Sequence, residues 1–333
     1  MFIVLISSRK KLISILFLIL ICGAFLFKNN LRKYFYGVKP NVMFLQEDLG
    51  GYTRDKVKEV VATKFERWEI TPVDALYDPH SNHIVPELWG YEVNIQDTVD
   101  KIMEAPKGGS ILPVYNPVFP DVTVEDYPSA IIAQGNPEKK QVSFMINVAW
   151  GTEHVLPMLE ILSAERCYAT FFLVGKWAKQ NVNLVDEINV RGNLLGNHGH
   201  TDSVVYTELS KEEIENGLKE VNDIVYAVTG KIPVYFTPHK GEYNDLVLEV
   251  ASRQGIRTVL WSLDTVDWDN PGVEKMKAKI IDNLHGGAII LMHPTAETVT
   301  FIKDIIPIIK NKGYNIVTIN ELLSPHYPPD KRE

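Results

Sequence analysis

The sequence has very little cysteine, with only Cys22 and Cys167 among its 333 residues. Cys22 lies in an apolar N-terminal stretch, so Cys167 has no second cysteine in the body of the chain with which to form a disulfide. The body also lacks an excess of positive charge: residues 1–33 hold six basic side chains and no acidic one, yet the whole chain has a net charge of −8. Because nucleic acid phosphates require clustered Lys and Arg, we expect no nucleic acid partner.

The N-terminal segment is basic and apolar. Residues 12–27 form an uncharged run of 16 residues between basic side chains. As a helix this run spans about 24 Å, and flanking lysines can extend it toward the roughly 30 Å of a bilayer core. We therefore expect residues 1–33 to be a membrane anchor, which makes the chain a single-pass membrane protein with its body extracytoplasmic. A cleaved signal peptide followed by secretion is the alternative.

Residues 34–130 predict a small α+β domain. Apolar residues share one face of a helix expected over 54–68, a shorter helix is expected over 98–105, and prolines and glycines interrupt the stretch between them. The motif Asp48–Thr53 (DLGGYT) resembles that of small peptidoglycan-binding domains of bacterial wall proteins, and a simple spacer is the alternative. Residues 131–140 are rich in turn formers and charge, so we expect a linker there.

Residues 141–325 have a regular alternation that predicts a parallel α/β fold. Short apolar runs alternate with amphipathic helical patterns, which is typical of strand–helix repeats. Periodicity alone leaves a distorted (β/α) barrel of about seven strands and an open doubly wound sheet as alternatives. The expected strands cover 143–148, 168–174, 194–198, 234–239, 258–264, 288–293 and 315–320.

Polar residues stand at the ends of five of these strands. They are Asn147, His198, His239, Asp264 and His293. Parallel α/β folds bind ligands and carry out chemistry at the carboxyl ends of their strands, so we expect these side chains to form one site.

The segment around His198 has the residue types of a metal site. His198 and Asp202 are four residues apart, so a single helical turn would direct both toward one ion. Imidazole and carboxylate groups both bind zinc. We expect His198 and Asp202 to be the ligands, with His200 or His239 as a further candidate. A solvated loop is the alternative.

Five short motifs occur in an order that identifies a family. They are Ala169–Gly175 (ATFFLVG), Gly196-Asn197-His198, Pro238 with Gly241–Asn244 (GEYN), Trp261–Trp268 (WSLDTVDW) and Leu291-Met292-His293. With these motifs, residues 141–323 resemble the NodB-like polysaccharide deacetylases, carbohydrate esterase family four. Within that family they are most similar to a sporulation-associated subgroup of endospore-forming bacteria. The resemblance favours the distorted barrel.

The resemblance implies a metal-dependent amide hydrolase that acts on N-acetyl groups. In the family a divalent metal, such as zinc, nickel or cobalt, is held by one aspartate and two histidines. A second aspartate acts as the base, and a histidine protonates the departing amine. Here the aspartate pair corresponds to Asn147 and Val148, which makes the first motif degenerate. His293 corresponds to the acid.

The resemblance also gives the remaining expected roles. Asn147 would orient water, and Asp264 joins the catalytic set. The expected substrate contacts are Trp150, Pro238, Leu291 and Trp268. We therefore expect deacetylation of cell-wall amino sugars, in peptidoglycan or a chitin-like glycan, in the setting of sporulation. The alternative is a catalytically inactive protein of the same family that binds glycan or acts as a scaffold.

Overall fold

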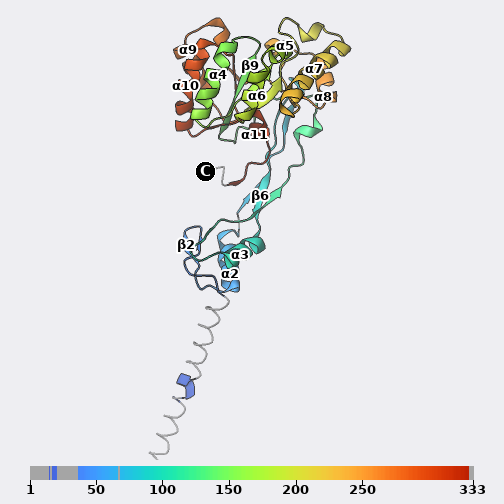
Figure 1. Ribbon diagram of the computed structural model, residues 1–333. Helices are drawn as coiled ribbons and strands as arrows, with labels where there is room; N and C mark the ends of the chain where they lie inside the picture. The colour runs from blue at the N-terminus through green and yellow to red at the C-terminus, as the bar shows by residue number, and fades with distance from the viewer. Residues whose placement is uncertain (1–14, 16, 21–36, 67, 330–333) are drawn as a thin grey trace, which may run out of the picture. The chain divides into compact units, whose positions relative to one another are not determined.

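The computed structural model describes residues 15, 17–20, 37–66 and 68–329, and the chain divides into two compact units (Figure 1). Unit 1 combines the chain up to Thr71 with Gly90–Val118, and unit 2 combines Pro72–Trp89 with the chain from Phe119 onward. The expected membrane segment, residues 1–33, lies largely outside the described residues. Among the residues that are described, no helix has the length and apolar character needed to cross a membrane.

Unit 1 is a small α+β unit built on two helices. Helix α2 (Arg54–Lys64) packs on α3 (Ile95–Glu104), whose first turn is capped by the Asn94 side chain. Helix α2 ends at Lys64, before the expected helix end at Trp68. The Trp68 ring instead packs against the ring of Tyr115, with centroids 5.0 Å apart. The strands form two three-stranded sheets, β2 (Glu47–Asp48), β1 (Met43–Phe44) and β7 (Ser110–Ile111), and β3 (Glu69–Ile70), β6 (Gly90–Val93) and β8 (Tyr115–Val118).

Unit 2 is a parallel sheet surrounded by helices, which confirms the predicted strand–helix barrel in outline (Figure 1). Seven strands follow in the order β13-β12-β11-β10-β9-β15-β14, and β16 pairs with the start of β9. The strands are β9 (Gln141–Val148), β10 (Thr170–Leu173), β11 (Leu194–Asn197), β12 (Tyr235–Phe236), β13 (Arg257–Thr258), β14 (Leu263–Asp264), β15 (Ile289–Met292) and β16 (Asn315–Ile316). A separate hairpin joins β4 (Leu76–Asp78) to β5 (His83–Val85).

The helices of unit 2 lie between the strands in the chain. They are α4 (Thr152–Ala164), α5 (Gly175–Gln180), α6 (Val182–Val190), α7 (Lys211–Thr229), α8 (Asp245–Arg253), α9 (Val273–Asn283), α10 (Ala296–Asn311) and α11 (Ile319–Leu323). A capping box of Ser210 and Glu213 begins α7, with the Glu213 carboxylate accepting from the Ser210 backbone amide at 2.8 Å.

The central strands have two buried faces, and successive side chains alternate between them. On β9, Phe144, Ile146 and Val148 belong to the core between sheet and helices. Met145 belongs to a second core, inside the curl of the sheet, together with Ile289 and Leu291 of β15. This alternation decides which strand-end residues can reach the interior.

Two expectations about this unit were wrong. Residues 258–264 do not form one strand: β13 and β14 lie at opposite edges of the sheet, because the chain between them bonds to two different neighbours. The Leu260 amide donates to the Ile132 carbonyl, and the Ser262 amide donates to the Ile289 carbonyl. The end of the expected strand 234–239 is likewise a 3₁₀ turn over His239–Gly241.

Residues 131–140 are not an exposed linker. Ile132 pairs with Val259 and Gln134 with Ala288, so this segment bonds to residues near β13 and beside β15. Lys139 is 1% exposed, and its ammonium donates to the carbonyls of Leu322 and Glu321 at the end of α11. Turn-forming composition fitted a linker, but these backbone pairings make the segment part of unit 2.

Candidate functional site

The carboxyl ends of β9, β11 and β15 bring Asn147, His198 and His293 to one end of the barrel. Asn147 follows Ile146 of the helix-side core, so the strand alternation turns its side chain to the interior face. His293 directly follows Met292, which pairs with Ile146. Asn147 and His198 are each 4% exposed.

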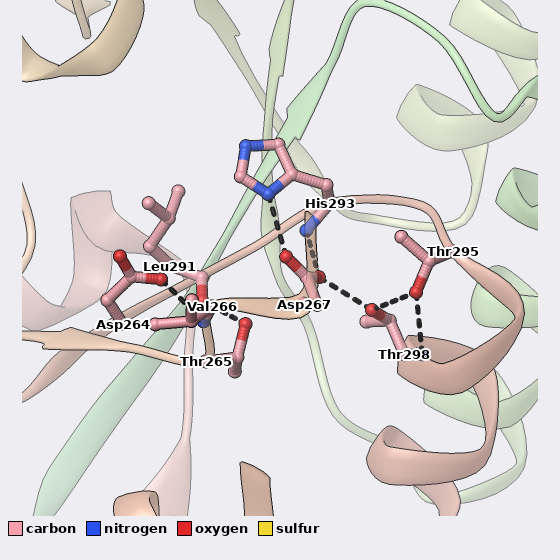
Figure 2. Close-up of polar contacts among 8 residues, drawn as sticks. All are labelled: Asp264, Thr265, Val266, Asp267, Leu291, His293, Thr295 and Thr298. Carbon is pink, nitrogen blue, oxygen red and sulfur yellow. Dashed lines mark hydrogen bonds and ion pairs between the residues drawn. The ribbon is translucent and has the colours of Figure 1, made fainter. Parts of the chain in front are cut away.

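His293 is held by a buried aspartate, Asp267, which the sequence analysis did not single out (Figure 2). The His293 ring donates from Nδ1 to Asp267 Oδ1 at 2.8 Å, and the His293 backbone amide donates to Oδ2 at 2.6 Å. Thr298 Oγ1 also donates to Oδ2, at 2.6 Å. Asp267 is 0% exposed and has no Lys or Arg partner among the described contacts. Nδ1 carries the proton in this bond, so Nε2 is an acceptor where the ring has no second proton, and Figure 2 shows that nitrogen turned away from Asp267.

Trp150 forms one wall of the site beside His293. Its ring is nearly parallel to the His293 ring, with centroids 5.8 Å apart, and the residue remains 44% exposed. Gly151 permits this approach: its φ is +70°, and a Cβ there would lie 2.0 Å from the Pro294 carbonyl oxygen. The position therefore requires glycine, which keeps Trp150 against the histidine.

His198 and His239 form a second imidazole pair, with ring centroids 4.1 Å apart. His198 Nδ1 lies 2.7 Å from the Thr237 carbonyl oxygen and must therefore donate to it, which leaves Nε2 as an acceptor. Burial lowers the pKa of His198 well below its ordinary value, and the neighbouring His239 and His293 add to the effect. Burial also lowers the pKa of His239, against the opposing influence of Asp202. Both rings are therefore neutral.

The expected helical turn from His198 to Asp202 is absent. Gly199 has φ +77°, and a Cβ there would meet Tyr206 Oη at 2.3 Å, so the chain turns sharply instead of continuing as a helix. His200 faces away toward α7, where its Nδ1 lies 3.2 Å from Glu220 Oε2. Asp202 is exposed. The helical turn on which the prediction of His198 and Asp202 as joint ligands rested is therefore missing, while Asp202 still acts electrostatically on His239. The pairing of His198 with Asp202 stays a prediction.

The other expected site residues have varied surroundings. Asp264 Oδ1 accepts from the Val266 amide at 2.8 Å, so this carboxylate stabilises its own turn (Figure 2). Leu291 is 3% exposed in the interior core and Pro238 is buried, whereas Trp268 is 58% exposed next to Asp267. Their expected roles stay predictions.

Asp267 belongs to the same WSLDTVDW motif as Asp264. Its position between the apolar residues Val266 and Trp268 is the signal in the sequence that could have indicated a buried carboxylate.

The side chains do not fit the metal that the resemblance implies. A catalytic zinc keeps three protein ligands, and among the described residues no group of three His, Cys, Asp or Glu side chains could hold an ion. Val148 has no ligand atom and is 0% exposed in the helix-side core. The remaining metal-donor groups at this end are the imidazoles and the Asn147 amide. The Asp267 carboxylate is already bonded to His293 and Thr298, and Asp202 is exposed.

Comparisons with known proteins identify the family. A family model described as polysaccharide deacetylase matches residues 134–259. The Bacillus subtilis protein YlxY is 34% identical, over 81% of this chain and 84% of that protein. A peptidoglycan-N-acetylglucosamine deacetylase of Bacillus cereus is 35% identical, over 50% of this chain and 80% of that protein.

Solved structures give the same family. A CE4 family pseudoenzyme from Bacillus anthracis has a TM-score of 0.70 and 32% identity, covering 80% of this chain and 95% of that chain. A mutant described as having restored enzymatic activity matches equally well in TM-score. The chain therefore belongs to the polysaccharide deacetylase family, the CE4 carbohydrate esterases.

Proposed function

We propose that this protein binds an amino-sugar glycan of the bacterial cell wall at the Trp150–His293 end of the barrel and does not hydrolyse its N-acetyl groups. One observation carries the proposal: Asn147 and Val148 stand where the family resemblance calls for an aspartate pair, and the Val148 side chain is packed into the core. An amide that carries no charge cannot take the proton of an attacking water, and a general base contributes about 10²–10⁴ in rate.

The binding half of the site supports a retained glycan contact. Trp150 is a half-exposed indole beside His293, and Trp268, which directly follows Asp267, is a second exposed indole. Aromatic faces of this kind offer large apolar contact at low conformational cost. Relatives named as peptidoglycan and chitooligosaccharide deacetylases support peptidoglycan or a chitin-like glycan as the partner.

Hydrolysis of N-acetyl groups is the second candidate, and the intact Asp267–His293 pair favours it. A histidine whose Nδ1 is bonded to a buried carboxylate is suited to hold a proton for a departing amine. Hydrolysis also needs a metal and a base, which the residues around His198 do not supply.

Three measurements on the full chain, purified in mild detergent, separate the two candidates. We expect it to sediment with insoluble peptidoglycan, to release no acetate from it, and to contain no stoichiometric zinc, nickel or cobalt. Acetate release that disappears in His293→Ala, together with metal that disappears in His198→Ala, would establish the hydrolase. Failure to sediment with peptidoglycan would refute glycan binding.

A double variant tests why activity is missing. Asn147→Asp with Val148→Asp restores the carboxylate pair, but the second change puts a charge at a position that is 0% exposed. We expect the double variant to lose several kcal/mol of stability. Zinc can restore that stability only if the end of β9 turns so that the new carboxylate at position 148 faces the interior of the barrel. Zinc that raises the melting temperature of the double variant, and not that of the native chain, would support this explanation.

We extend the proposal to the whole chain. Residues 1–33 anchor the protein in the bacterial membrane, with secretion after cleavage as the alternative, and unit 1 also binds peptidoglycan. We also propose that the protein acts in sporulation. The apolar run of residues 12–27 supports the membrane anchor, and the Asp48–Thr53 motif supports the binding of peptidoglycan by unit 1. Loss of the protein from the membrane fraction when residues 1–33 are deleted is the expected result.

A further inference from the structure

The strand-end site holds several buried polar atoms without a partner. Asn147 Oδ1, Thr237 Oγ1 and His239 Nε2 are all buried and unpartnered. The Asn147 oxygen is an acceptor, and so are the Nε2 atoms of His198 and His293 where each ring carries its proton on Nδ1. His239 Nε2 is a further acceptor in the tautomer protonated at Nδ1. Acceptor atoms therefore gather at this end of the barrel.

These acceptor atoms belong to one neighbourhood. The centroids of the His198 and His239 rings are 4.1 Å apart, and His293 is close enough to act electrostatically on His198. Asn147 is the next-to-last residue of β9, and the pairing of Ile146 with Met292 places it beside the start of the His293 loop. A buried acceptor without a donor is unfavourable, so a ligand that supplies donors to these atoms gains affinity.

The charge of the site favours a cationic donor. Asp267 is a fully buried carboxylate whose described partners are His293 and the Thr298 hydroxyl, and none of these is a permanent cation. Close to His239, Asp202 and Lys240 act in opposite directions, so their effects partly cancel. Among the described residues, Asp267 thus has no Lys or Arg beside it to balance its carboxylate.

Resting on the proposed glycan binding, we propose that the site recognises the free amino group of a de-N-acetylated glycan, a glucosamine residue, rather than the N-acetyl group. A protonated amine has three N–H donors and no acceptor, which matches a set of acceptors near one carboxylate. An acetamido group offers a single N–H and adds a carbonyl oxygen that needs a donor of its own. The protein would therefore read wall glycan on which a deacetylase has already acted.

Titration calorimetry on the full chain in mild detergent, at neutral pH and 0.15 M salt, tests this inference. The ligands are the tetramers of glucosamine and of N-acetylglucosamine, with tetralysine as a cation of similar charge. We expect the glucosamine tetramer to bind at least tenfold more tightly than the acetylated one, and tetralysine not to bind at the site.

Variants that remove acceptor atoms at nearly constant volume locate the effect. Asn147→Leu and His239→Phe should each reduce affinity for the glucosamine tetramer severalfold more than affinity for the acetylated tetramer. His80→Phe, at an exposed histidine elsewhere in unit 2, is the matched control and should change neither affinity. A near-ultraviolet circular dichroism spectrum like that of the native chain shows that a variant is folded.

The outcomes are distinct. Equal or tighter binding of the acetylated tetramer overturns recognition of the amine and leaves glycan binding intact, and so does equal binding of tetralysine. Stoichiometric zinc at His198 and His239 also overturns it, because an ion would then occupy the acceptors. Binding of neither sugar refutes the proposed function itself.

Discussion

Replacing Asp267 by alanine is the sharpest test of how the retained half of the site is built. The change removes the acceptor for the His293 amide, the His293 ring and the Thr298 hydroxyl at once. Each hydrogen bond to a charged group contributes about 1.5–3 kcal/mol, and removing the carboxylate also relieves the cost of having buried it. Breaking a buried pair of this kind has a net cost of about 3–5 kcal/mol.

For a unit of this size that loss corresponds to a fall in melting temperature on the order of 10 °C. The assay is thermal unfolding of the full chain followed by near-ultraviolet circular dichroism. Asp264→Ala is the matched control in the same segment, because its carboxylate accepts a single bond from the Val266 amide and is only half-buried. We expect it to cost about 1 kcal/mol. An equal or larger loss in the Asp264 variant would refute the view that Asp267 organises the His293 loop.

Three further predictions concern the backbone, the buried histidine and the aromatic wall. Gly151→Ala should lose more than about 3 kcal/mol, since the methyl meets a backbone oxygen 2.0 Å away, whereas Gly255→Ala, at φ +71° with open space, should lose only about 1–2 kcal/mol in the same denaturant titration. Because burial lowers the pKa of His198, the unfolded chain binds more protons than the folded chain below about pH 6.5. The stability of the fold should therefore be full above that pH and fall as the pH decreases. His198→Asn should flatten this dependence between about pH 7 and 5, and an unchanged slope would contradict the prediction. Trp150→Ala should weaken glycan binding about tenfold in calorimetry, equivalent to about 1.4 kcal/mol, and more than Trp268→Ala does, because Trp150 is the indole stacked on the retained histidine.

The strand alternation and the strand-end residues could be predicted from the sequence because they depend on local periodicity. Side chains on a strand alternate between faces whatever the rest of the chain does. Alternation along residues 143–148 therefore requires that Ile146, which packs on the helix side, and Asn147 face opposite sides of the sheet. The family motifs followed for the same reason, since each is a short contiguous stretch.

Contacts between distant segments decided the remainder. Residues 131–140 have the composition of a linker, but Ile132 pairs beside β13 with a residue more than a hundred positions later. The chain after His198 turns at Gly199 and does not continue as a helix; this glycine has a φ of +77° and lies where the approach of Tyr206 leaves no room for a Cβ. Spacing along the chain contains no information on such approaches.

The choice between two aspartates of one motif shows the same division. The sequence by itself predicted that Asp264 of WSLDTVDW would lie at the strand ends with His293, and it did not single out Asp267. Only the tertiary structure decided that Asp267 bonds to the histidine while Asp264 caps its own turn. The physical reason is that a buried carboxylate is stable only where enough donors meet it, and the donors from His293 and Thr298 are brought to Asp267 by the packing of β15 and α10.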